Sequence, residues 1–352
     1  MVIVIGADVH KATHTFVAVD EVGRKLAERT VRATTSGHDG ALRWARAAFG
    51  PELRWGVEDC RHLSARLERD LLAAGQRVVR VPPKLMAQTR ASARERGKSD
   101  PIDALSVARA VLREPGLPAA SHDAATRELK LLVDRREDLV GERTRQINRV
   151  RWHLHELDPE FEIPVKALRS RKQRDRVAGW LSDGTGLVAE LARDVLTDIV
   201  TVSEKIDALE KRVTLLVEQR YPHLLAIPGC GPLAAAKIAG ETANVSRFRS
   251  EACFAMNAGV APLPVWSGNT RGRVRMSRAG NRQLNAALHR IAVTQIRLDS
   301  PGRAYYRKRL DTGDSRVEAL RCLKRKLARI VFHALHTDQQ QIETPASQPL
   351  VA

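Results

Sequence analysis

Four carboxylates in the first third of the chain stand at the ends of predicted secondary-structure elements. Asp8 follows an apolar strand directly, in IGADVHK, and Glu58 ends another strand, in WGVED. Asp100 and Asp103 belong to KSDPIDA, and because they lie three residues apart at a helix start they project from one face. Acids gathered in this way can hold two Mg²⁺ or Mn²⁺ ions, which activate an attacking oxygen and stabilise the leaving oxygen of a phosphodiester.

Each of these acids also has a structural explanation. The segment from Asp100 to Asp103 is a good helix start, with an Asp cap, a proline at the first helical position and an acid in the first turn. Glu58 and Asp59 alternate across a strand, so only one of them faces the site, and we choose Glu58. A strand that ends in Gly-x-Asp also opens actin-like sugar kinases and ATPases, but their glycine-rich phosphate loops are not visible in this sequence.

A second candidate for chemistry lies in WSGNTRGRVRMSRAGN. Ser267 stands in a glycine-flanked loop, and it is followed by four arginines: Arg271, Arg273, Arg275 and Arg278. A serine hydroxyl becomes a good nucleophile where a base or a cationic, metal-rich setting favours the alkoxide, and guanidinium groups can stabilise the charge of a phosphorus transition state. Composition alone also allows a plain Ser-Gly turn whose arginines only bind phosphate.

Two further motifs in the C-terminal part bear on DNA contact. LLAIPGCGPLAAAKIAG resembles a helix-hairpin-helix, in which Gly229 and Gly231 let the backbone approach a phosphate at a helix N-terminus; an ordinary helix corner is the alternative. Tyr305 and Tyr306, in GRAYYRKR, could suggest a tyrosine recombinase, but we interpret them as stacking or packing residues on a basic helix.

The composition of the chain favours a polyanionic partner. The 352 residues carry a formal net charge of +18, which indicates nucleic acid rather than solubility alone. We expect no membrane association and a cytoplasmic location, because the sequence contains neither a long apolar run nor the apolar core of a signal peptide. The scattered cysteines form no zinc or redox motif and are read as reduced structural residues: Cys60, Cys230, Cys253 and Cys322.

The carboxylates require an α/β domain to position them, which we place at residues 1–120. Strands are predicted at Val2 to Ile5, His14 to Val19, Lys25 to Val31, Arg54 to Val57 and Arg77 to Val81. The short connections between the first three predict an antiparallel meander, and a helix from His62 to Ala74 makes the last strand a parallel addition. A helix from Asp100 to Leu112 closes the domain.

Residues 121–220 are predicted to form an antiparallel helical coiled-coil arm. Apolar residues recur every three or four positions along its second half: Leu187, Leu191, Val195, Ile199, Val202, Ile206, Leu209, Val213 and Leu216. In the first half, Arg136 and Arg143 interrupt a less regular stripe. We expect a mainly helical domain at residues 221–336 and a disordered tail at 337–352, where apolar periodicity ends.

Taken in order, these motifs resemble the DEDD transposases of the insertion-sequence-110 family. GADVHK, VED and KSDPIDA match the N-terminal signature, and IPGCGPLAAAKI, AGVAPLPVWSGNTRGR and MSRAGNRQLNAAL match the C-terminal one. The resemblance covers the chain from Met1 to about Leu335. It departs from the family after Ser267, where Gly268-Asn269-Thr270-Arg271 replaces the usual Gly-Gly pair and lysine.

The resemblance implies a ribonuclease H-like (RuvC-like) domain, a coiled-coil arm and a transposase domain. It implies a metal-binding tetrad of Asp8, Glu58, Asp100 and Asp103 and a serine that becomes joined to DNA, at Ser267 with Ser277 as second choice. It further implies donor and target double-stranded DNA as substrates, a structured non-coding guide RNA, and a homo-oligomer that builds its active site between subunits.

Two other functions remain open on the sequence alone. One is a metal-only, structure-specific nuclease in which Ser267 has no role, and the other is a basic nucleic-acid-binding protein with a decayed site. A covalent protein–DNA adduct distinguishes the first from a serine recombinase, because hydrolysis by water leaves no adduct.

Overall fold

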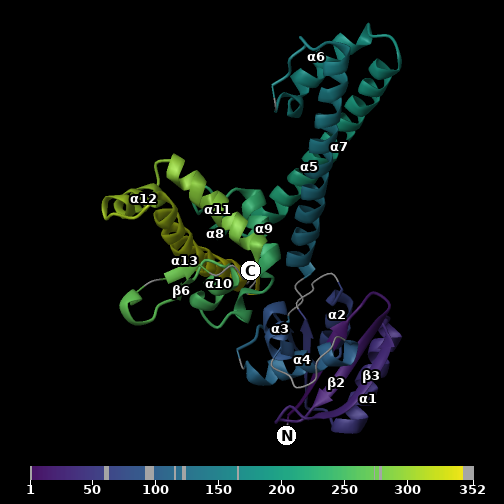
Figure 1. The fold of residues 1–352 in the computed structure, drawn as a ribbon, viewed down its shortest axis with the longest axis vertical. Helices are drawn as coiled ribbons and strands as arrows, with labels where there is room; N and C mark the ends of the chain where they lie inside the picture. The colour runs from purple at the N-terminus through teal and green to yellow at the C-terminus, as the bar shows by residue number, and fades with distance from the viewer. Residues whose placement is uncertain are drawn as a thin grey trace, which may run out of the picture. The chain divides into compact units, whose positions relative to one another are not determined.

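The structure is a computed structural model of the chain, and it describes residues 2–58, 63–91, 99–114, 116–120, 124–164, 166–272, 274–276 and 280–343. The chain divides into two compact units (Figure 1). The N-terminal unit comprises Met1–Asp123 and Asn244–Cys253, and the helical unit comprises Ala124–Ala243 and Phe254–Ala352.

A five-stranded sheet of order β3-β2-β1-β4-β5 forms the centre of the N-terminal unit. Its strands are β1 (Ile3–Val9), β2 (Thr13–Val19), β3 (Lys25–Arg32), β4 (Leu53–Glu58) and β5 (Arg77–Val81). The first three strands pair antiparallel, whereas β4 and β5 are parallel to β1. This is the predicted ribonuclease H-like arrangement, and the expectation for the fold is confirmed. Asp8 lies within β1 and not after it, because the strand continues to Val9.

Helices cover both faces of this sheet. They are α1 (Thr35–Phe49), α2 (Ala65–Ala73), α3 (Pro83–Ala91) and α4 (Asp100–Arg113). Residues of α1 and α2 pack in one apolar cluster with Ile5, Phe16 and Trp55, and residues of α4 pack against Val4 on the other face. Because β1 is covered on both sides, all seven of its residues are buried and its sequence does not alternate.

The helical unit contains the predicted arm. The arm consists of α5 (Ala124–Leu157), the 3₁₀ turn η1 (Ala167–Arg169), α6 (Arg171–Ser182) and α7 (Leu187–Arg220). In Figure 1, α5 and α7 run side by side with α6 at one end. They are antiparallel, because the contact from Arg136 to Glu210 near one end is matched by Gln146 to Asp198 further along.

The buried side of α7 differs from the predicted seam at one end. Leu187 and Leu191 are 67% and 42% exposed, while Ala189, Ala192 and Leu196 are buried in their place. The reason is that η1 and α6 join the packing at this end, through Leu168, Val177 and Leu181, so the apolar surface of α7 faces a different direction there. The arginines that interrupt the stripe of α5 also have partners, since Arg136 bonds to Glu210 and Arg143 to Ser203.

The rest of the chain is mainly helical, as expected. Its helices are α8 (Pro222–Leu225), α9 (Pro232–Thr242), α10 (Glu251–Asn257), α11 (Arg282–Arg297), α12 (Pro301–Asp311) and α13 (Arg316–Glu343), with 3₁₀ turns η2 (Val245–Arg247) and η3 (Gly268–Thr270). A small antiparallel hairpin pairs β6 (Pro262–Pro264) with β7 (Val274–Met276). No helix in the described part of the chain is both long and apolar enough to span a membrane.

The expectation of a disordered tail from residue 337 is wrong for residues 337–343. The helix α13 continues to Glu343, and Asp338 within it is fully buried. Its carboxylate accepts hydrogen bonds from the backbone amides of His223 and Leu224, so this polar residue closes the N-terminal end of α8. Residues 344–352 lie outside the described residues.

Candidate active site

Asp8 and Glu58 come from neighbouring parallel strands. Ala7 of β1 pairs with Val57 of β4, so the two acids follow the last paired positions. Gly6 and Gly56 both face α4, and because side chains alternate along a strand, the residues two positions later face the same side. The sheet therefore directs Asp8 and Glu58 toward the face that α4 covers.

A close approach of α4 brings its first turn over these strand ends. A Cβ atom on Gly6 would lie 2.0 Å from the carbonyl oxygen of Ala104, and one on Gly56 would lie 2.5 Å from a methyl group of Val111. Only glycine fits at such distances. Both acids stand two residues after one of these glycines, so the Gly-x-Asp spacing noted at Asp8 recurs as Gly-x-Glu at Glu58.

The structure brings Asp8 and Asp100 together through a histidine. The Nε2 atom of His10 lies 3.0 Å from Oδ2 of Asp8 and 3.4 Å from Oδ1 of Asp100. One ligand atom from each of these residues lies within 4.8 Å of the other two. His10 was not among the predicted site residues, although it stands two positions after Asp8 in the strand-end sequence ADVHK.

Asp103 and Glu58 are not members of that three-residue group among the described residues. Asp103 is buried and accepts a hydrogen bond of 2.8 Å from Arg90 of α3. Glu58 is half-buried at the end of β4. The structure thus places all four predicted acids on one side of the sheet, with Asp8 and Asp100 in the closest group.

The electrostatics of this cluster are unfavourable for ionised Asp8. Burial raises the pKa of Asp8, and the nearby charges of Asp103 and Asp100 raise it further, although the contact with His10 opposes both effects. A cation bound among these groups would relieve this repulsion. The carboxylates of the donor set also fit a divalent metal, because carboxylate oxygens are the ligands that Mg²⁺ and Mn²⁺ prefer.

The helix-capping explanation for Asp100 does not hold. The N-cap of α4 is Ser99, with extended backbone angles, and Asp100 is the first residue of the helix. Its side chain therefore lies in the first turn, where the contact with His10 is made.

Ser267 lies in the loop of the β6–β7 hairpin of the helical unit. The loop joins Pro264 to Val274, and Ser267 immediately precedes η3. Ser267, Arg271 and Arg275 are exposed. The other predicted site residues of this segment, Arg273, Arg278 and the alternative nucleophile Ser277, lie outside the described residues.

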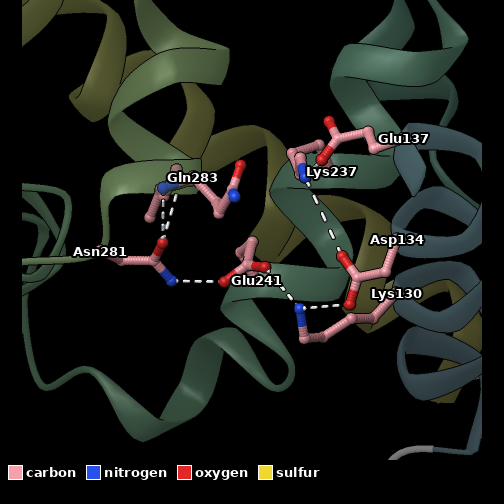
Figure 2. A network of polar contacts seen from close by, with 8 residues as sticks. Lys130, Asp134, Glu137, Lys237, Glu241, Asn281 and Gln283 are labelled. Atoms are coloured by element: carbon pink, nitrogen blue, oxygen red, sulfur yellow. Dashed lines mark hydrogen bonds and ion pairs between the residues drawn. The ribbon is translucent and has the colours of Figure 1, made fainter. Parts of the chain in front are cut away.

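A polar network surrounds the N-terminus of α11, which follows the β6–β7 hairpin in the sequence, as Figure 2 shows. Asn281 caps α11 by accepting from the amides of Gln283 and Leu284, and its Nδ2 donates to Oε2 of Glu241 at 2.5 Å. The other oxygen of Glu241 accepts from Nζ of Lys130 in α5 at 2.7 Å. The start of α11 is therefore bonded to α9 and, through α9, to the arm.

Two lysines contact the acids of the network. Burial would lower the pKa of Lys130, but hydrogen bonds to Asp134 and Glu241 outweigh it, and the pKa is raised. Lys237, which is buried, lies 2.6 Å from Glu137 and 4.0 Å from Asp134. The buried acid of this network, Glu241, thus has a lysine partner, whereas buried Asp8 contacts a histidine.

The remaining predicted residues lie in the same unit as the serine loop. Gly229 has a φ of +78°, and a Cβ atom there would lie 3.1 Å from the side chain of Thr294, so this turn requires glycine. Gly231 is the N-cap of α9. Tyr305 is half-buried on α12 with Nζ of Lys326 4.5 Å from its ring centre, as expected of a packing residue.

The sheet order, the acids on its α4 face and the basic composition define a nucleic-acid-cutting enzyme of ribonuclease H-like fold. Comparison with known proteins makes this assignment specific. A family model described as "Transposase", for DEDD transposases, matches residues 5–159, and one described as "Transposase IS116/IS110/IS902 family" matches residues 221–307. The chain belongs to the IS110 family of DNA transposases.

Relatives from other insertion elements agree with this assignment. The chain is 26% identical to the 44.8 kDa protein of insertion element IS116 from Streptomyces clavuligerus, over 97% of this chain and 96% of that one. It is 26% identical to the 42 kDa protein of insertion element IS900 from Mycobacterium paratuberculosis, over 94% of each. The Thermus thermophilus RuvC structure in complex with a Holliday junction substrate matches 34% of this chain and all of that one, with 16% identity and a TM-score of 0.28; the fold assignment rests instead on the strand order.

Proposed function

We propose that this transposase cuts and rejoins DNA by transesterification, with Asp8, Glu58, Asp100 and Asp103 as metal ligands and Ser267 as the nucleophile. The observation that carries the proposal is the convergence of Asp8 and Asp100 at the start of α4, in a cluster whose charges lack lysine partners among its described contacts. When bound there, Mg²⁺ or Mn²⁺ would neutralise charge on the scissile phosphate and on the leaving oxygen.

Residues of the chain supply the nucleophile, the positive charge and the phosphate-binding groups. The Oγ atom of Ser267 bonds to the scissile phosphorus, its proton passes to solvent, and the bond from phosphorus to one sugar oxygen breaks. Arg271 and Arg275, both exposed on the same hairpin as the serine, neutralise the phosphate during this step. The turn at Gly229 and the N-terminus of α9 bind a neighbouring backbone phosphate.

The partners follow from the family. DNA is the substrate of a transposase, and we propose that a structured non-coding RNA directs the protein to its donor and target sites. Ser267 and the acids belong to different compact units of the chain, and both must act on one phosphate. We propose that different subunits of a homo-oligomer supply them.

The test is to trap the protein–DNA adduct in Mg²⁺ with the wild type, Ser267→Ala and Ser277→Ala. We expect loss of the adduct with Ser267→Ala alone. Loss with Ser277→Ala alone would transfer the role to that serine. Strand cleavage without any adduct in the wild type would favour a metal-only nuclease. Mixing Ser267→Ala with Asp8→Asn subunits should restore adduct formation if the site is shared, and no restoration in a demonstrably mixed oligomer would contradict sharing.

A further inference from the structure

The tip of the serine loop exposes apolar side chains that the proposed chemistry does not use. Trp266, directly before Ser267, is 50% exposed, and Val265 beside it is 42% exposed. Val274, which follows the loop and pairs with Pro264, is 58% exposed. A large aromatic side chain held in water next to a nucleophile indicates a ligand that covers it.

The charge around this tip shows which kind of ligand fits. Between Glu251 and Asp299 the sequence has seven arginines and neither Asp nor Glu. Arg271 and Arg275 are exposed on the same hairpin. Such a segment repels cationic surfaces, including a second copy of this basic chain, and attracts a polyphosphate. Of the polyphosphates, nucleic acids also carry flat apolar faces, the bases, which stack on aromatic side chains.

We propose that Trp266 stacks on an unpaired nucleobase next to the phosphate that Ser267 attacks. The side chains of Val265 and Val274 form the apolar edge against which the displaced base lies, and the arginines hold the flanking phosphates. The inference rests on the proposed role of Ser267 only for the position of that base. Stacking would hold the displaced base and the backbone next to it in place. A base drawn out of its helix leaves the adjoining phosphodiester exposed.

The experiment uses the full chain, freed of copurifying nucleic acid by high salt. The probe is a 30-nucleotide single strand with 5-iododeoxyuridine at every third position, compared with the same sequence as a duplex. Light of long wavelength couples iodouracil to a stacked aromatic ring, and mass spectrometry locates the coupled residue. We expect coupling at Trp266. Trp266→Phe should retain binding, and Trp266→Ala should weaken single-strand affinity about tenfold.

Trp152 is the matched control, because it lies on α5 and is 72% exposed. Trp152→Ala should leave coupling at Trp266 unchanged. The proposal is overturned if Trp266→Ala binds single strands as tightly as the wild type, or if it changes the sedimentation of the protein without changing DNA affinity. Since Trp266 is exposed, an unchanged melting temperature shows that Trp266→Ala is folded. Ser267→Ala should keep the coupling and lose the adduct, so an adduct that survives Ser267→Ala removes the serine's role and leaves the base contact standing.

Discussion

Asp8 of the N-terminal unit and Glu241 of the helical unit are both buried carboxylates, at 7% and 3% exposure, but their neighbours differ. Glu241 accepts hydrogen bonds from Lys130 and Asn281, and further acids of its network contact Lys237. Asp8 contacts His10, and its other charged neighbours, Asp100 and Asp103, are acids that raise its pKa.

This difference distinguishes a structural network of buried charges from a cluster suited to catalysis. A buried acid with a fixed lysine partner contributes to holding helices together, and it needs nothing from outside the chain. A cluster of acids that disfavour each other's charge is costly for the fold, and it persists where a cation or a substrate makes the charges useful. Four measurements test the comparison of the two regions, from the largest expected change in unfolding free energy to the smallest.

The largest change in stability is expected from Glu241→Gln. The substitution removes the charge of buried Glu241 and leaves half-buried Lys130 with Asp134 as its carboxylate partner. Loss of this charged hydrogen bond costs about 3 kcal/mol of unfolding free energy. Glu218→Gln, on an exposed position of α7, is the control and should change little. Denaturant unfolding of the full chain measures both. Equal effects of the two substitutions would mean that the network is not structural.

The N-terminal unit should lose stability in acid through His14. Burial, followed by the effect of His38, lowers the pKa of His14 to about 4. The unfolded chain therefore binds a proton more readily, so stability present above pH 6.5 is lost as the pH falls toward 4, by about 3 kcal/mol. The difference in unfolding free energy between wild type and His14→Phe, followed over this range, measures it. A difference that does not vary with pH would refute the prediction.

Gly6→Ala should displace α4 from the strand ends. The new Cβ atom would meet the backbone at Ala104, and overpacking of this kind costs about 1–3 kcal/mol. Because α4 carries Asp100, we expect strand cleavage to fall more than stability does. Gly40→Ala in α1, which has nothing within 4 Å of its new Cβ, is the matched control. Full cleavage activity in a folded Gly6→Ala protein would show that this close approach does not position the acids.

Asp8→Asn should change the unfolding free energy in the opposite direction to Glu241→Gln. Without divalent metal, removing a charge that burial disfavours, with smaller contributions from Asp103 and Asp100, should raise the unfolding free energy slightly. The rise should be about 1 kcal/mol or less, because loss of the contact with His10 offsets part of it. Thermal melting in a chelator measures it. A destabilisation as large as that of Glu241→Gln would mean that Asp8 belongs to a compensated network, and the contrast between the two regions would disappear.

The sequence predicted the strands of the sheet and the elements that carry the acids, because apolar strands and helix starts are local patterns. It did not reveal α1 between the third and fourth strands. It also did not reveal the contact between His10 and Asp100, which depends on how closely α4 packs on Gly6. The sequence also left open whether Asp100 is the N-cap of α4. The backbone angles in the structure decide this question, because Ser99 is the N-cap and Asp100 is the first residue of the helix.

Errors in the arm and tail arose from packing partners that are distant in sequence. Heptad spacing predicts one continuous seam on α7, but α6 packs at one end and leaves Leu187 exposed. A polar segment after His336 reads as a tail, whereas the buried bonds from Asp338 to α8 keep α13 helical. The sequence of α7 does not show that α6 packs on it, and the sequence of α13 does not show that Asp338 bonds to α8.

The most direct test of the central claim, that DNA is cut at the acids around Asp8, is Mg²⁺-dependent strand cleavage of element-end DNA by wild type and Asp8→Asn, with binding measured in the same samples. We predict that the cleavage rate of Asp8→Asn is lower than that of the wild type by a factor of about 10³ or more. Its DNA affinity should stay within about twofold of the wild type. Cleavage by Asp8→Asn at the wild-type rate, or equal cleavage by the wild type in a chelator, would contradict the account.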